Sequence, residues 1–437
     1  MADFSTQRRE RVLAADRAHV WHPYTQMKTY REGPDPLVIA RAEGPYLEDT
    51  AGRRYLDGNS SWWVSVLGHG HPTVKRRVVE QMEDLAHCSL AGITHEPAAS
   101  LATRLVESTP AGLEHVFYSD DGSTAVEVAL KMAFQYFQQN GQPKRTRFVS
   151  FQGGFHGETI GCVSVGGVSL FHKMYQPLLF DVLFCPSPAD GPEALAAFRE
   201  LMAEHGDSVA GVVIEPLVQG AAGMRMYSEA AFREIAAATK EAGAYLIADE
   251  VFVGFGRTGS MWACERAGVE PDFLCTSKGL SAGMLPFAAT LTTGKVFDGF
   301  LGDAESGRTF YYGHSYCGNP LGCAAALAVL DVFEEEQVLA GVDLRAQRMA
   351  EGLEALAKLP AVESVRQTGL IGALDLQERG VGGYLDDAGW QVYYRALELG
   401  AYLRPLGNIV YFAPPVNIPL DDLERLLQIA ETAIASL

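Results

Sequence analysis

The sequence predicts an α/β protein whose core is a mostly parallel sheet. From about residue 70 to residue 310, short apolar runs alternate with amphipathic helical patterns, which is typical of a parallel sheet covered by helices. The chain has 437 residues, more than one hydrophobic core normally uses, so we expect two domains. Acidic residues follow several of the predicted strands, and α/β sheets bind ligands at the carboxyl ends of their strands.

The spacing of apolar residues predicts the individual elements. One helix that begins near residue 125 buries residues at the i, i+4, i+7 and i+11 positions, namely Val126, Leu130, Ala133 and Phe137. A second long helix is expected over Pro320–Glu335, and a late strand from Arg404 to Phe412 with a turn at Gly407-Asn408. The clearest earlier strand candidates are 116–118, 147–151, 211–214, 245–248 and 273–276.

Composition and charge restrict the function. With 35 basic and 54 acidic residues the formal net charge is −19, which argues against nucleic acid or an anionic membrane as a partner. No apolar run reaches the ~18 residues of a membrane span, and the N-terminus lacks the apolar segment of a signal peptide. Seven cysteines without CxxC spacing indicate free thiols in the cytoplasm. His69 and His71 fit a glycine-rich turn better than a metal site, so no metal is expected.

Lys278 and Asp249 follow two of the predicted strands. They are 278 − 249 = 29 residues apart, about one crossover in an α/β fold. An amine and a carboxylate at neighbouring strand ends are what pyridoxal phosphate chemistry needs. The amine forms a Schiff base, and the carboxylate keeps the pyridine nitrogen protonated. A lysine after a strand is more often a surface residue, so this pair alone does not identify the cofactor.

A phosphate site is predicted where a strand leads into the helix near residue 125. Gly122 lets the backbone approach an anion closely, and Ser123 and Thr124 add hydroxyl groups at a helix N-terminus. The same residue types are common as N-caps, so capping remains an alternative.

Aromatic and acidic residues follow the next strands. Phe155, flanked by glycines, could cover a flat ring. Glu215, Asp249 and Glu250 are expected to converge on one sheet edge, where they would bind either a metal or a cationic pyridinium. The nearby Lys278 favours the pyridinium.

One competing motif and three substrate candidates complete the pattern. Residues 254–259 match GxGxxG, but they do not directly follow a strand, so a dinucleotide site is weakly supported. Trp62-Trp63 and the cluster Trp21-His22-Pro23-Tyr24 offer aromatic surfaces. Arg404 offers a partner for a carboxylate. Packing or surface pairing would explain each of them as well.

Taken in order, these motifs resemble the class III aminotransferases, pyridoxal-phosphate enzymes of fold type I. The resemblance covers essentially the whole chain and includes the glycines of 254–259, which removes the dinucleotide interpretation. It implies a seven-stranded sheet in a large domain (61–329) and a smaller α+β domain from 1–60 and 330–437. It rests on Gly122-Ser123, Phe155-His156-Gly157, Glu215-Pro216, Asp249-Glu250, Gly254–Gly259, Ser277-Lys278-Gly279 and Gly318-Asn319-Pro320-Leu321.

The resemblance also implies a role for each matching residue. Lys278 and Asp249 would be catalytic, and His314 and Ser315 would reach the cofactor phosphate from the partner subunit of a homodimer. The cofactor-binding residues would be Gly122, Ser123, Phe155, His156, Glu215, Asp249, Lys278, His314 and Ser315. The substrate-binding residues would be Tyr24, Trp62, Trp63, Phe155, Arg257, Gly313 and Arg404, with Arg257 on the amino-donor side and Arg404 on the carboxylate.

Segments outside the cofactor motifs bear on the substrate. Trp21–Met27, Ser60–Trp63 and Leu403–Pro405 resemble members of the class that aminate 8-amino-7-oxononanoate with S-adenosyl-L-methionine in biotin biosynthesis. Gly313-His314-Ser315-Tyr316 departs from the Gly-Pro-Thr-Phe pattern of adenosylmethionine users and leaves lysine open as donor. Phe155 replaces a frequent tyrosine, and Glu158 an aspartate. A broader ω-amino acid or amine aminotransferase, an aminomutase and a non-catalytic binding protein remain alternatives.

Overall fold

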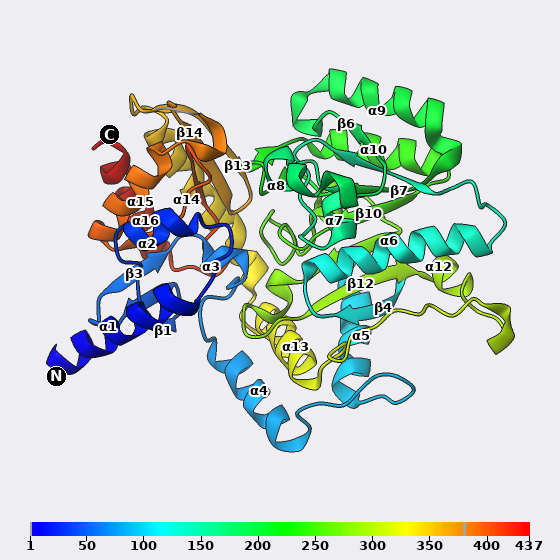
Figure 1. The fold of residues 1–437 in the computed structure, drawn as a ribbon, viewed down its shortest axis with the longest axis horizontal. Helices are drawn as coiled ribbons and strands as arrows, with labels where there is room; N and C mark the ends of the chain where they lie inside the picture. Colours follow the sequence, from blue (N-terminus) through cyan, green and yellow to red (C-terminus); the bar gives the residue numbers. More distant parts are fainter. Residues whose placement is uncertain (1, 379–381) are drawn as a thin grey trace.

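A seven-stranded sheet forms the centre of the larger part of the molecule (Figure 1). The structure, a computed structural model, describes residues 2–378 and 382–437. All neighbouring strands are parallel except those next to β12, so the predicted mostly parallel, seven-stranded sheet is confirmed. The strand order is β4 (Leu113–Ser119), β12 (Ala288–Thr293), β11 (Phe273–Thr276), β10 (Tyr245–Asp249), β7 (Val209–Ile214), β5 (Arg147–Phe151) and β6 (Val182–Cys185).

Helices cover both faces of this sheet. Every residue of β7 and β10 is buried, as expected for central parallel strands. Alternate residues of β10 belong to different cores: Ile247 packs with α6 (Gly122–Gln139), and Leu246 with the cluster that contains Phe232 of α10 (Glu229–Glu241). The predicted buried face of α6 is confirmed, since its four apolar residues are at most 4% exposed.

The two ends of the chain come together in a second part of the molecule, on the left of Figure 1. Its four-stranded sheet combines β1 (Ile39–Glu43), β2 (Tyr46–Asp49) and β3 (Arg54–Asp57) with β15 (Ala401–Tyr402). A three-stranded sheet of β13 (Val362–Thr368), β14 (Ile371–Leu376) and β16 (Ile409–Phe412) lies beside it. The domain boundaries at residues 60 and 329 stay predictions.

The predicted helix over Pro320–Glu335 is confirmed as α13, which packs on α4 (Pro72–Asp84) and α5 (Glu96–Ser108). The other helices are α1 (Ala2–His19), α2 (Met27–Glu32), α3 (Ser60–Trp63), α7 (Ile160–Val165), α8 (Ser169–His172), α9 (Pro192–His205), α11 (Ala263–Ala267), α12 (Gly294–Asp298), α14 (Val342–Leu356), α15 (Ala388–Leu399) and α16 (Leu420–Ile434). A short hairpin joins β8 (Val218–Gln219) and β9 (Arg225–Met226). In the described ranges, no helix has the length and apolar character needed to cross a membrane.

The expected strand from Arg404 to Phe412 is confirmed for Ile409–Phe412, as is the turn at Gly407-Asn408, but it is wrong for the residues from Arg404 up to that turn. β15 ends at Tyr402, before Arg404, and β16 begins only at Ile409. Pro405 has no N–H for a strand ladder, and Gly407 has a φ of 63°, so the chain turns between the two strands. Arg404 therefore lies in an irregular connection.

Candidate active site

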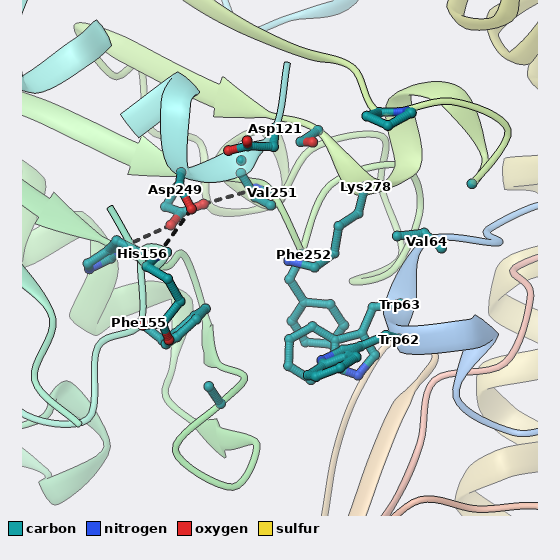
Figure 2. A pocket seen from close by; sticks show the side chains of 18 of the residues that line it. Trp62, Trp63, Val64, Asp121, Phe155, His156, Asp249, Val251, Phe252 and Lys278 are labelled. Carbon is teal, nitrogen blue, oxygen red and sulfur yellow. Dashed lines mark hydrogen bonds and ion pairs between the residues drawn. The ribbon is translucent and has the colours of Figure 1, made fainter. Parts of the chain in front are cut away.

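A cavity of about 550 Å³ opens at the carboxyl ends of the central strands, against residues of the second part of the molecule (Figure 2). It brings together most of the residues predicted from the sequence. Those that line it are Tyr24, Trp62, Trp63, Gly122, Ser123, Phe155, His156, Glu215, Asp249, Lys278 and Arg404.

The N-terminus of α6 forms one end of the cavity. Asp121 caps the helix by accepting a hydrogen bond from the Thr124 N–H at 2.9 Å, so the capping interpretation is correct for Asp121 and Thr124. The N–H groups of Gly122 and Ser123 lie in the first turn, outside the intrahelical ladder, and are available to an anion. A Cβ on Gly122 would lie 2.7 Å from Cγ1 of Val251, so only glycine fits here without movement.

Asp249 is held in place at the end of β10. Its Oδ2 lies 2.8 Å from Nδ1 of His156, and its Oδ1 accepts a hydrogen bond from the Val251 N–H at 3.1 Å. The other imidazole nitrogen of His156, Nε2, is buried and has no partner among the described residues. Asp249 therefore faces the cavity as an oriented carboxylate.

Glu215 supports the loop that carries Phe155. Its carboxylate accepts hydrogen bonds from the N–H groups of Phe155 and Gly220, each at 2.9 Å. The pKa of Glu215 is raised to about 7 because burial outweighs the opposing effect of the neighbouring His156.

The third acidic residue of the predicted group, Glu250, does not reach the cavity. It accepts hydrogen bonds from the N–H groups of Ala263 and Cys264, at the start of α11. The expectation that all three carboxylates converge is therefore wrong for Glu250. Its carboxylate instead caps the N-terminus of α11.

Lys278 enters the cavity directly after β11 (Figure 2). Desolvation lowers the pKa of its amine, while the negative charges of Asp249 and Glu215 oppose that shift. Its Nζ lies 5.2 Å from the centre of the Trp63 ring. A lowered pKa increases the fraction of free amine, the form that acts as nucleophile or base.

These groups fit pyridoxal 5′-phosphate. The helix N-terminus suits a phosphate, Phe155 offers an aromatic face, and Asp249 offers a carboxylate for a protonated pyridine nitrogen. The backbone at Gly157 also lies very close to Ser123, because a Cβ there would lie 2.0 Å from the Ser123 hydroxyl. Amine, carboxylate and anion site thus lie around one cavity.

Aromatic residues and one arginine form the opposite wall. The Tyr24 ring meets Trp62 edge-on at 5.5 Å, and its hydroxyl donates to Glu158. The Arg404 guanidinium lies 5.0 Å from the Trp62 ring and 5.8 Å from that of Trp390. Stacking of this kind leaves the N–H groups at the edge of the guanidinium free to bind a carboxylate.

The two tryptophans are carried by an unusual turn. Ser60, Ser61, Trp62 and Trp63 all have positive φ, between 47° and 75°. A left-handed conformation costs non-glycine residues about 1–2 kcal/mol each. The Ser60 hydroxyl donates to the Ala413 carbonyl at 2.7 Å, and the Trp63 indole donates to the Tyr411 hydroxyl at 3.0 Å. These buried hydrogen bonds offset part of that cost.

Four predicted site residues do not line the cavity: Arg257, Gly313, His314 and Ser315. Arg257 is fully buried and donates to the Pro414 carbonyl. Burial lowers its pKa to about 9. The structure thus does not bring Arg257 to the cavity, and its predicted contact with the amino donor has no support in this geometry.

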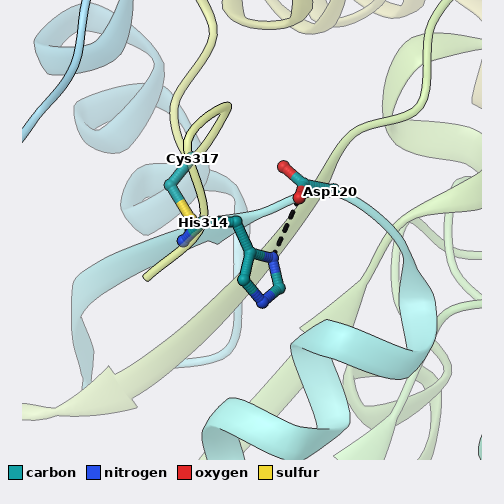
Figure 3. A group of neighbouring side chains, drawn as sticks. All are labelled: Asp120, His314 and Cys317. Atoms are coloured by element: carbon teal, nitrogen blue, oxygen red, sulfur yellow. Dashed lines mark hydrogen bonds and ion pairs between the residues drawn. The ribbon is translucent and has the colours of Figure 1, made fainter. Parts of the chain in front are cut away.

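His314 lies against the same chain's Asp120 (Figure 3). Its Nδ1 is 2.9 Å from Oδ2 of Asp120, and its backbone N–H donates to Sγ of Cys317 at 3.1 Å. Ligand atoms of these three residues lie within 4.8 Å of one another, a mixed set that zinc accepts. His314 already bonds to both Asp120 and Cys317, so the geometry alone does not require an ion.

Sequence reasoning missed several hydrophobic residues of the cavity. Phe252 packs on Trp63 with ring centres 4.2 Å apart, and Phe171 meets Tyr24 edge-on at 5.2 Å. Phe252 comes three residues after Asp249, so the segment following the acidic strand end was the available signal. Phe171 lies in the short helix α8, which has no motif of its own.

The comparisons agree with this site. A profile of the family described as Aminotransferase class-III matches residues 29–434. This chain belongs to that family. Class III aminotransferases depend on pyridoxal 5′-phosphate, as the cavity suggests.

Individual relatives of this class III aminotransferase cover nearly all of it. It is 45% identical to the adenosylmethionine-8-amino-7-oxononanoate aminotransferase of Nitratidesulfovibrio vulgaris, over 98% of this chain and 82% of the relative. It is 43% identical to the enzyme of that name from Geobacter sulfurreducens, over 99% of both chains. The crystal structure of the Methanocaldococcus jannaschii enzyme of that name matches with a TM-score of 0.94 at 38% identity, over 98% of this chain and 99% of the other.

Proposed function

We propose that this aminotransferase transfers an amino group from S-adenosyl-L-methionine to 8-amino-7-oxononanoate, giving 7,8-diaminononanoate in biotin biosynthesis. One observation carries the acceptor: Lys278 and Arg404 line the same cavity, with Trp62 and Trp63 beside them. An amino oxo acid with a long apolar chain matches this arrangement, with its oxo group at Lys278 and its carboxylate at Arg404. Full-length relatives named for this reaction support it.

Different residues of the cavity bind different parts of the cofactor. Bound pyridoxal phosphate supplies an aldehyde and an electron-accepting ring. Gly122 and Ser123 would hold the phosphate at the helix N-terminus, and Phe155 would cover a ring face. Asp249, oriented by His156, would keep a proton on the pyridine nitrogen.

Lys278 moves the proton at the substrate carbon. Its lowered pKa favours the free amine, which accepts that proton and returns it during amination. Arg404, stacked on Trp62, binds the carboxylate and so fixes which carbon faces Lys278.

The amino donor is tested separately from the acceptor. Lysine is the second candidate, because Gly313-His314-Ser315-Tyr316 departs from the pattern of adenosylmethionine users. Purified enzyme is mixed with 8-amino-7-oxononanoate and either adenosylmethionine, lysine, 4-aminobutyrate or alanine, and 7,8-diaminononanoate is measured by mass spectrometry. We expect product with adenosylmethionine. Product only with lysine changes the donor, and no product with any donor refutes the acceptor.

We also propose that the enzyme is a homodimer in which His314 and Ser315 reach the partner's cofactor phosphate. Neither residue lines the cavity of its own chain, and the neighbouring Tyr311 and Tyr316 are 85% and 62% exposed. Large exposed aromatic side chains are typical of protein–protein interfaces.

Mixing two inactive variants tests the shared site. A subunit with Lys278→Ala still supplies His314, and a subunit with His314→Ala still supplies Lys278. If sites are shared, the mixed dimer contains one intact site and regains activity. If each chain completes its own site, the mixture stays inactive.

We place the reaction in the cytoplasm. All seven cysteines are free thiols, which suits a reducing compartment.

A further inference from the structure

Asn59 lies behind the wall of the cavity that carries Arg404. Its side chain is 1% exposed. Its Oδ1 accepts a hydrogen bond from the backbone N–H of Arg404 at 2.6 Å, and its Nδ2 donates to the Tyr411 carbonyl at 3.1 Å. Because one partner is a donor and the other an acceptor, the side-chain amide satisfies both in a single orientation.

Asn59 also closes the left-handed turn that carries Trp62. Its carbonyl accepts a hydrogen bond from the Trp63 N–H at 2.8 Å. The Trp62 ring is the surface on which the Arg404 guanidinium rests, 5.0 Å away. The Asn59 side chain thus holds the backbone of Arg404, while its backbone carbonyl closes the turn that carries Trp62.

We infer that Asn59 is a positioning residue for recognition of the acceptor's carboxylate. The inference rests on the proposed function, in which Arg404 binds that carboxylate. Asn59 does not line the cavity itself, and its side chain acts through the backbone of Arg404. Bidentate binding of a carboxylate requires a guanidinium held at a fixed place and angle. Loss of the Asn59 amide therefore weakens binding of acids more than that of neutral analogues of equal length.

Two variants remove the amide without adding a buried charge. Asn59→Leu keeps a similar volume and deletes both side-chain hydrogen bonds. Asn59→Ser is smaller and retains one hydroxyl, and it carries the test if the leucine variant does not fold. Folding is checked by the thermal unfolding midpoint and by the absorbance of the bound cofactor.

The readout compares heptanoate with heptanamide as competitive inhibitors of the holoenzyme. In Asn59→Leu we expect the inhibition constant of heptanoate to rise about tenfold and that of heptanamide to stay within about twofold. The KM for the oxo acid rises with that of heptanoate, while kcat changes less than about threefold. Asn59→Ser shows the same pattern, more weakly.

Ser60→Ala is the matched control. It removes the hydrogen bond to the Ala413 carbonyl from the same turn without touching the Arg404 backbone, so the acid-to-amide ratio should not change. Equal weakening of both inhibitors in the Asn59 variants, or no change in either, overturns the inference.

Arg404→Gln separates this outcome from failure of the proposed function. If that variant loses the preference for the acid while the Asn59 variants keep it, only the role of Asn59 is refuted. If Arg404→Gln keeps the preference, Arg404 does not bind the carboxylate, and both proposals fail.

Discussion

The Nδ1 atom of His156 lies 2.8 Å from Oδ2 of Asp249, and both side chains are buried. This contact fixes the carboxylate from one side, while the Val251 N–H fixes the other oxygen at 3.1 Å. A buried carboxylate with two hydrogen bonds keeps its direction and stays ready to pair with a cation. The acid of the site is therefore oriented before any ligand binds.

Replacing Asp249 by asparagine should remove the charge while keeping the shape. We expect Asp249→Asn to lower kcat by at least about 100-fold, because the ring's positive charge is no longer stabilised. Steady-state kinetics with saturating cofactor measures this. Glu250→Gln is the control, since that neighbouring carboxylate caps α11 and should leave kcat within about threefold. A kcat for Asp249→Asn near that of the wild type would contradict the assignment.

Glu250 should make stability depend on pH. Burial raises its pKa to about 7 from 4.5, against hydrogen bonds from the N–H groups of Cys264 and Ala263. Since the folded-state pKa lies above the unfolded value, this stabilising contribution is complete below pH 4.5 and is lost as the pH rises through about 7. Glutamine stays neutral throughout.

The measurement for Glu250 is urea unfolding between pH 5 and pH 8. We expect the free energy of unfolding of the wild type to fall by roughly 2–3 kcal/mol relative to Glu250→Gln over that range. The exposed Glu83, changed to glutamine, should give a difference that does not vary with pH. Parallel curves for wild type and Glu250→Gln would show that burial does not shift this group.

A methyl group at Gly122 should disturb the phosphate end of the site. Its Cβ would lie 2.7 Å and 3.1 Å from the two methyl carbons of Val251, a β-branched side chain that cannot easily rotate away. Val251 also donates to Asp249, so the strain reaches both ends of the cofactor site. We expect Gly122→Ala to weaken pyridoxal phosphate binding at least about tenfold.

The double variant Gly122→Ala/Val251→Ala tests the cause of that loss. Shortening Val251 makes room for the methyl group, so most of the affinity should return in a fluorescence titration with the cofactor. Without recovery, the Val251 contact is not the reason, and normal binding by Gly122→Ala alone would refute the close approach.

The sheet and the cofactor end of the site were accessible from the sequence because local signals define them. Buried parallel strands are continuous apolar runs, and Asp249 and Lys278 lie at or just after the ends of two of them, while Gly122 follows the antiparallel strand β4. The capping residues next to Gly122 indicate the helix N-terminus. Such features depend on a few neighbouring residues.

The substrate wall depends instead on contacts between distant segments. Arg404 lies outside a strand because Pro405 and Gly407 turn the chain, and its stacking partner Trp62 is 342 positions earlier, since 404 − 62 = 342. No local pattern predicts four consecutive residues with positive φ at Ser60–Trp63. Likewise, only the hydrogen bonds from the start of α11 show that Glu250 turns away while Asp249 faces the cavity.

Chemical trapping of the cofactor tests the central claim most directly. The holoenzyme is reduced with borohydride and digested, and the peptide that carries the phosphopyridoxyl group is identified by mass spectrometry. We predict that the group lies on Lys278, and that Lys278→Ala yields no labelled peptide and no measurable amino transfer. Labelling of another lysine, or full activity of Lys278→Ala, would contradict the account.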